Sequence, residues 1–177
     1  MNDPEISLWA EDEAHFNLHG SSSRIWAPIG EQPEQLFKPT RKKVGYFGAV
    51  SLDTGQLEYQ RAESFNALSF LQFLEQMLVI QAVIKKKIYL ILDNSRYHHA
   101  NLLQDFLEEQ KNKLVLWFLP PYSPELNPQE RIWRQTRRKA THNKYFNDLK
   151  DLMLAVESKF LDWIVPNDEL WNLCAIK

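Results

Sequence analysis

The sequence has 177 residues, of which only one is cysteine, and it has no long uninterrupted apolar run. Cys174 alone excludes an internal disulfide and leaves no cysteine cluster for zinc, so we expect a reducing, cytoplasmic compartment. Gln81 and the lysines at 85–87 interrupt the longest apolar stretches, so we expect no membrane span and no membrane partner. The first residues, MNDPEISLWAEDE, lack the basic and apolar regions of a signal peptide.

The sequence also lacks a strong excess of charge of either sign. The net charge is −2, from 21 basic and 23 acidic residues, whereas a freestanding nucleic-acid-binding protein is usually more basic. The basic residues are nevertheless clustered, and the longest cluster consists of Arg131, Arg134, Arg137, Arg138 and Lys139. Each cluster taken alone is most simply a solvated surface, so the charge balance does not identify the partner.

Apolar residues make up 44% of the chain and include ten Phe and six Trp, which is typical of a packed globular domain. Apolar–polar alternation predicts a strand over residues 6–18, followed by a Ser-, Gly- and Pro-rich loop with a short strand inside it. Two further strands meet at Asp53-Thr54-Gly55, which is a hairpin signal. Helical spacing after a predicted N-cap at Ser64 indicates a helix of about four turns.

The second half of the chain alternates between strands and helices. KIYLILDN and LVLWFLP are short apolar runs typical of buried strands, and a helical pattern lies between them. Two more helices are predicted, one opened by Asn127 and Pro128 and one over residues 149–160. Hairpin strands followed by strand–helix–strand crossovers predict an α/β fold, a mixed sheet flanked by helices, in one domain over residues 1–177.

Three carboxylates stand at positions where such a fold could bring them together. Asp93 ends a predicted buried strand, Asp12 lies in the first strand, and Glu130 lies in the first turn of the helix after the proline-rich segment LPPYSPELNP. Converging carboxylates repel one another unless a cation neutralises them, and oxygen ligands suit Mg²⁺ or Mn²⁺. Two such ions would activate a nucleophile and stabilise the leaving oxygen of a phosphodiester.

Each carboxylate also has a simpler interpretation when it is taken alone. Asn127 and Glu130 have the spacing of a capping box, with Asn127 capping the helix and Glu130 reaching back. Asp93 could cap the loop that leads to the next helix, and Asp12 could be surface charge between two glutamates. His98 and His99 could be surface residues at a helix start.

Taken together, the segments resemble the three signature blocks of DDE-type transposases, in the mariner-like superfamily and its bacterial insertion-sequence branch. The first block, LWAEDEAHF, matches the family's first catalytic Asp followed by Glu with Asp12 and Glu13. The second block, LILDNSRYHHA, matches its Asp-Asn and nearby His with Asp93, Asn94 and His98.

The third block is the longest and most specific part of the resemblance. The family pattern Pro-Tyr-Ser-Pro-x-Leu-Asn-Pro-x-Glu is matched by PYSPELNPQE, which ends at Glu130. The 36 residues between Asp93 and Glu130 are close to the family's usual spacing. The resemblance covers the chain from about residue 6 to residue 165.

The resemblance implies a ribonuclease-H-like fold and a metal-dependent endonuclease and polynucleotidyl transferase that cleaves DNA and transfers strands. Asp12, Asp93 and Glu130 would hold Mg²⁺, or Mn²⁺ in its place, as two ions. Asn94, His98 and Asn127 would be auxiliary residues. The implied partners are transposon-end and target DNA, bound by an oligomer at the nucleoid, with the basic cluster at 131–139 contacting the DNA backbone.

One part of the family pattern is missing. Members usually carry helix-turn-helix modules ahead of the catalytic domain, and only eleven residues precede Asp12. A fused second reading frame, a truncated element and a separate DNA-binding subunit all remain open explanations. The alternative functions are another ribonuclease-H-like nuclease, which would hydrolyse without joining strands, and an inactive DNA-binding remnant of an insertion element.

Overall fold

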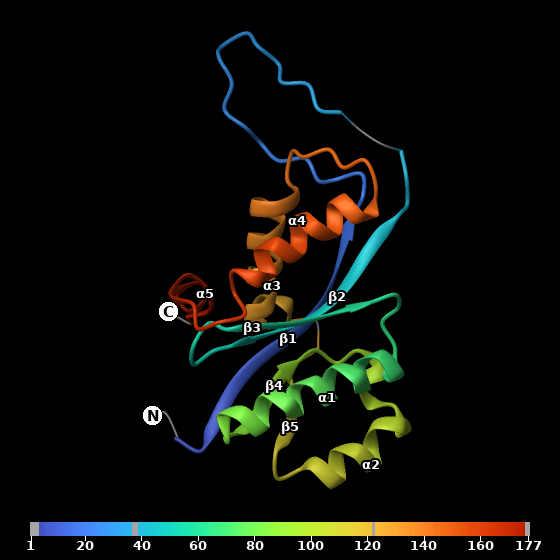
Figure 1. Ribbon diagram of the computed structural model, residues 1–177, viewed down its shortest axis with the longest axis vertical. Coiled ribbons are helices and arrows are strands. Elements are labelled where there is room, and N and C mark those ends of the chain that lie inside the picture. Colours follow the sequence, from blue (N-terminus) through green and yellow to red (C-terminus); the bar gives the residue numbers. More distant parts are fainter. Residues whose placement is uncertain (1–3, 37–38, 122, 176–177) are drawn as a thin grey trace.

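The acidic residues of the first block lie on β1 (Ile6–Asn17), the central strand of a five-stranded sheet in the order β3-β2-β1-β4-β5 (Figure 1). The computed structural model describes residues 4–36, 39–121 and 123–175. Strand β1 pairs antiparallel with β2 and parallel with β4, so the predicted mixed sheet is confirmed. The other strands are β2 (Lys43–Ser51), β3 (Leu57–Ala62), β4 (Lys87–Leu92) and β5 (Leu114–Phe118).

Helices cover both faces of the sheet (Figure 1). One face packs against α1 (Ala67–Ile84) and α2 (Asn101–Gln110), with a core that includes Phe47, Phe70 and Phe73. The other face packs against helices near the C-terminus, and Phe16, Trp133 and Phe160 lie in its core. These helices are α3 (Pro128–Thr136), α4 (Leu149–Leu161) and α5 (Asp168–Cys174).

Helix α1 differs from the sequence prediction in two respects. Its N-cap is Asn66 and not Ser64, because the Asn66 side chain accepts hydrogen bonds from the N–H groups of Leu68 and Ser69. It also continues through Gln81, which does not interrupt it. With 18 residues and a mean hydropathy of 1.6, α1 is long and apolar enough to cross a membrane, although its buried side packs on the sheet as core.

The segment between β1 and β2 projects from one end of the molecule (Figure 1). The short strand predicted inside it is not formed in its described part, where Ser21 makes only an isolated bridge to His142. Trp26 and Ile29 in this segment are fully exposed.

Two elements near the C-terminus were not predicted. A π-helical turn, Arg137–Thr141, continues α3, and α5 follows a cap at Asn167. Helix α5 has only seven residues, too few for apolar periodicity to reveal it.

Candidate active site

Asp12, Asp93 and Glu130 are far apart in the sequence but line one pocket of about 450 Å³. The pocket lies where the parallel strands end, because Asp93 directly follows β4 and Leu119 directly follows β5. The proline-rich segment and the first turn of α3 form the remaining wall.

Asp12 points to the side of the sheet on which α3 packs. Asp12 is the register partner of Gly48 on β2, and directly opposed residues of an antiparallel pair face the same side. A Cβ atom at Gly48 would lie 2.4 Å from the indole ring of Trp133 and 2.7 Å from the Gln129 amide nitrogen. Glycine therefore lets α3 lie directly on β2, on the side to which Asp12 points.

Asn127 joins α3 to the strand that carries Asp12. Its Nδ2 donates to the Glu11 carbonyl oxygen at 2.7 Å, and its Oδ1 accepts from the Gln129 N–H at 3.1 Å. The N–H of Asn127 donates to the carbonyl of Pro124, so the reciprocal bond of a capping box is not made by Glu130. The prolines and this link fix the position at which α3 begins. The Glu130 side chain does not cap the helix and lines the pocket.

Asp93 closes a local turn and also faces the pocket. Its carboxylate accepts hydrogen bonds from the Ser95 N–H at 2.8 Å and from the Ser95 hydroxyl at 3.1 Å. The imidazole Nδ1 of His98 lies 3.2 Å from the Asp93 carbonyl oxygen and 3.4 Å from Oδ1. The Asn94 amide donates to the Leu119 carbonyl, which ties the end of β4 to the end of β5. The local cap considered for Asp93 is therefore present, within the pocket wall.

The electrostatics of the pocket centre on Asp12. Burial, followed by the neighbouring charges of Glu13, Glu130 and Asp93, raises the pKa of Asp12 to about 8. None of the charges that shift this pKa is positive. The Oδ2 atom of Asp12 is buried and has no hydrogen-bond partner among the described residues. The pocket therefore combines crowded carboxylates with an oxygen that lacks a counter-ion.

Three carboxylates line the pocket, and an oxygen of one of them is buried without a partner among the described residues, so this donor set suits a hard divalent cation. In their present positions, no three acidic, histidine or cysteine side chains of the described residues are grouped closely enough to hold a metal ion.

The opposite side of β1 holds a second polar group, in which Glu11 joins Glu13 and the predicted auxiliary residue His98; no role was predicted for Glu11 from the sequence. The carboxyl group of Glu11 is completely buried with no hydrogen-bond partner among the described residues, and burial, followed by the charge of Glu13, raises its pKa well above the usual range. Burial lowers the pKa of His98 to about 4, so its contact with Glu13 at 3.9 Å is made by a neutral imidazole. Strand alternation would have placed Glu11 and Glu13 opposite Asp12.

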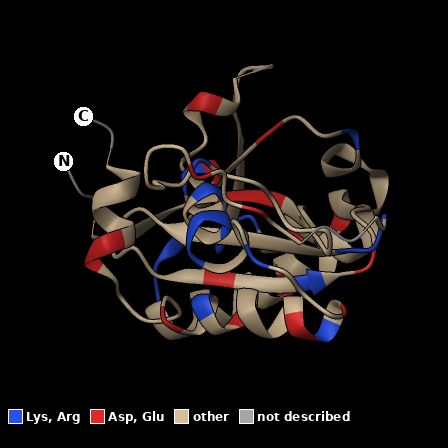
Figure 2. Ribbon diagram, turned by 90° about the horizontal axis from the view of Figure 1, so that it is seen from above, with Lys and Arg blue, Asp and Glu red and all other residues tan. Residues whose placement is uncertain are grey.

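The basic cluster at 131–139 is partly occupied by contacts within the protein. Arg131 donates to the carbonyls of Leu173 and Ala175, and Lys139 pairs with Glu169 at 2.5 Å. Arg137 lies over the ring of Phe16. Arg134 and Arg138 are exposed. Figure 2 shows basic and acidic segments interspersed along the ribbon. Contact of this cluster with DNA stays a prediction, carried best by Arg134 and Arg138.

A mixed sheet of this order, with helices on both faces and acidic residues on β1 and after β4, defines a ribonuclease-H-like core. Residues 7–153 match the sequence profile of the DDE superfamily endonucleases. The chain belongs to this family, and the resemblance seen in its three sequence blocks is confirmed.

Relatives in bacteria agree with this assignment. The chain is 25% identical over 162 residues to the insertion element IS630 uncharacterized 39 kDa protein of Shigella sonnei, covering 92% of this chain and 46% of that protein. It is 33% identical over 87 residues to the uncharacterized protein y4pE/y4sA of Sinorhizobium fredii, covering 49% of this chain and 58% of that protein. The chain therefore spans about half the length of these relatives.

Solved structures with the same fold include complexes of the Mos1 transposase. The Mos1 paired-end complex with the left transposon end matches with a TM-score of 0.67 and 18% identity, covering 96% of this chain and 51% of that chain. The Mos1 mariner paired-end complex with Mg matches with a TM-score of 0.64 and 19% identity over 96% and 51% of the two chains. At these identities the likeness establishes the fold.

Proposed function

We propose that this chain is the catalytic part of a DNA transposase, which cleaves DNA and transfers strands with divalent metal ions held by Asp12, Asp93 and Glu130. One observation carries the proposal: three carboxylates from separate sequence blocks line one pocket, and the Asp12 oxygen buried there has no partner among the described residues. Membership of the DDE superfamily endonucleases supports it.

The residues of the chain have separate tasks in this proposal. Asp93 is held by Ser95 and Asp12 by its strand, while Asn127 and the prolines before it set the position of Glu130. Glu130 lies in the first turn of α3, where the helix dipole favours a negative charge. Two bound Mg²⁺ ions would supply activation of the attacking oxygen and stabilisation of the leaving oxygen.

DNA is the partner that this chemistry requires. The Mos1 complexes contain paired transposon ends, and Mos1 structures with Mg and with Mn have been solved. By analogy we propose that this chain acts as an oligomer on DNA and takes Mg²⁺, with Mn²⁺ as a substitute. Because the IS630 protein is about twice as long as this chain, recognition of the element ends would reside in a further part, either fused or separately encoded.

A strand-transfer assay tests the proposal. The protein is incubated with a pre-cut end oligonucleotide, a supercoiled plasmid and Mg²⁺ or Mn²⁺, and joined products are separated from nicked plasmid. We expect joining that requires the metal and is abolished in Asp93→Asn, with the fold retained. Nicking without joining would identify a hydrolytic nuclease, and cleavage that survives in Asp93→Asn would contradict the assignment of the site.

A further inference from the structure

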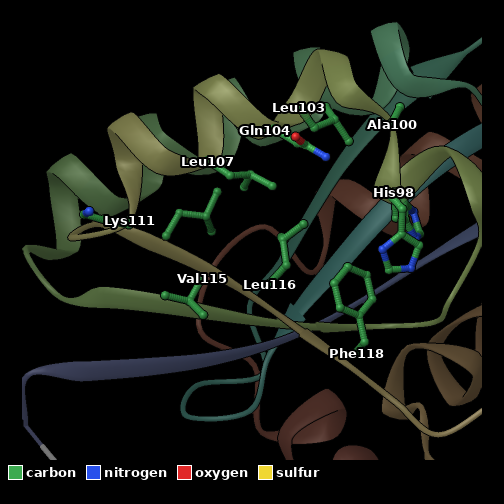
Figure 3. A pocket seen from close by; sticks show the side chains of 11 residues that line it. His98, Ala100, Leu103, Gln104, Leu107, Lys111, Val115, Leu116 and Phe118 are labelled. Atoms are coloured by element: carbon green, nitrogen blue, oxygen red, sulfur yellow. The ribbon is translucent and has the colours of Figure 1, made fainter.

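The helices that cover the α3 side of the sheet leave part of it open. Helices α3 and α4 pack on β1 and β2, whereas β4 and β5 make their main helix contacts on the opposite side, with α1 and α2. On that opposite side, Leu116 and Phe118 point from β5 towards α2, across a pocket of about 360 Å³ (Figure 3). The α3 side of β4 and β5 has no equivalent cover among the described elements.

The register of the strands identifies the residues on this open side. Leu8 pairs with Tyr89, and Ala10 pairs with Ile91. Ile91 in turn pairs with Trp117. Residues at every second position of a strand share a side, so these side chains face the same way as Asp12. We call Leu8, Tyr89, Ile91 and Trp117 the open face.

The open face is aromatic and is bordered by positive charge. The Trp117 side chain is 62% exposed and Leu8 is 40% exposed. The Tyr89 and Trp117 rings lie 6.2 Å apart between centroids, at an interplanar angle of 54°. The Lys87 ammonium lies 5.5 Å from the Tyr89 ring centroid. Aromatic rings beside lysine form the kind of surface that binds unpaired nucleic acid strands.

The open face continues into the candidate active site. Ile91 is two residues before Asp93, and Trp117 is two residues before Leu119, so both strands lead from the open face into the pocket that Asp93 and Leu119 line. Arg96 lines the same pocket. Positive side chains therefore stand at both ends of the path, Lys87 at one and Arg96 at the other.

We propose that the open face binds an unpaired stretch of the DNA strand that enters the active site, with a nucleobase stacked on the indole of Trp117. The bases of an intact duplex are stacked on one another, so this contact selects a frayed or single-stranded segment. The positive charge of Lys87 and Arg96 at the two ends of the path favours a nucleic acid strand, with its phosphate backbone, as the occupant of the open face over the apolar surface of a second copy of the protein. The inference rests on the proposed function, since it takes DNA as the substrate.

Nuclear magnetic resonance of the tryptophan indole N–H groups tests the stacking directly. The protein has six Trp, and the spectrum of Trp117→Phe identifies the Trp117 signal. Titration with a short oligothymidylate should shift this signal in a saturable way. The signal of Trp171, which is 46% exposed on α5, is the matched control and should stay unchanged. An abasic oligonucleotide with the same backbone should not shift the Trp117 signal, because it has no base to stack on the indole.

Affinity measurements complete the test. Trp117→Ala should weaken binding of the oligothymidylate about tenfold, Trp117→Phe should weaken it less because a ring remains, and Trp171→Ala should have no effect. An unshifted Trp117 signal, or an equal shift with the abasic strand, would overturn the inference. A shift that depends on protein concentration without DNA would identify a second copy as the occupant and also overturn it.

The result is separable from that of the metal site. Asp93→Asn should lose strand transfer and keep the Trp117 shift. If Asp93→Asn loses strand transfer while the Trp117 signal of the wild-type protein never responds to DNA, the active-site proposal stands and the open face is wrong.

Discussion

The two sides of β1 place neighbouring carboxylates in different surroundings. Asp12 points towards α3 and lines a pocket that also contains Asp93 and Glu130. Glu11 and Glu13 point to the α1 side, where Glu11 is fully buried and Glu13 lies 3.9 Å from His98. One side offers carboxylates to a cation in a pocket, and the other encloses them. The position of an acid on the strand, and not its presence in an acidic run, therefore decides whether it faces the pocket.

The largest expected effect separates the two sides directly. Asp12→Asn should reduce metal-dependent strand transfer to background, because it removes a proposed metal ligand, and Glu11→Gln should leave it within a few-fold of wild type. The strand-transfer assay measures both variants, and circular dichroism checks that both are folded. Equal loss in Asp12→Asn and Glu11→Gln would show that the two sides are not functionally distinct.

A second experiment tests the link between β1 and α3. Asn127→Ala should lower the free energy of unfolding by about 1 kcal/mol or somewhat more, because it removes a helix cap and the bond to the Glu11 carbonyl. It should also reduce strand transfer strongly, since Glu130 is no longer held in place. Asn66→Ala, which removes the cap of α1 far from the pocket, is the matched control.

Urea unfolding and the strand-transfer assay compare these two cap variants. Similar losses of stability with a loss of activity only in Asn127→Ala are expected. If both variants lose activity in proportion to stability, Asn127 contributes to the site only as a helix cap.

The pH dependence of stability sharpens the comparison further. The pKa of Asp12 is about 8 and that of Glu13 about 7 in the folded protein, compared with ordinary values of 3.8 and 4.5. The folded state therefore holds these protons more tightly than the unfolded state. Stability in the presence of a chelator should be greatest near pH 4 and fall as the pH rises towards 8.

Urea unfolding across this pH range, with and without Mg²⁺, measures the effect. Asp12→Asn should flatten the decline because it removes one of the two groups, and Mg²⁺ should reduce the decline in the wild-type protein by compensating the ionised carboxylates. A decline that Asp12→Asn leaves unchanged would show that the buried acids on the α1 side account for it alone.

The smallest expected effect concerns the buried side. Burial raises the pKa of Glu11 well above its usual range, so the folded protein favours the neutral form of this side chain. Glu11→Gln then replaces one neutral group by another of similar shape, and the free energy of unfolding should change by less than about 1 kcal/mol. Equilibrium unfolding in urea checks this, and a change of several times that size would indicate an ionised Glu11.

Much of the fold could be predicted from the sequence, because apolar alternation on β1 and the runs in β4 and β5 specify strands directly. The resemblance of the three blocks to the family signatures implied a joint site of Asp12, Asp93 and Glu130, and all three line one pocket. Other features depend on contacts between distant segments. The bond from Asn127 to the Glu11 carbonyl and the binding of Arg131 to the end of α5 have no local signal. Alternation separates Glu11 from Asp12, but it does not tell which side is enclosed.

The most direct test of the central claim is a crystal structure of the protein with Mn²⁺ and a short end oligonucleotide, in which anomalous scattering locates the manganese. We expect a manganese peak bounded by the carboxylates of Asp12, Asp93 and Glu130, on the α3 side of β1. A pocket without manganese, with the three carboxylates pointing apart into their own local hydrogen bonds, would contradict the assignment of this pocket as the catalytic metal site.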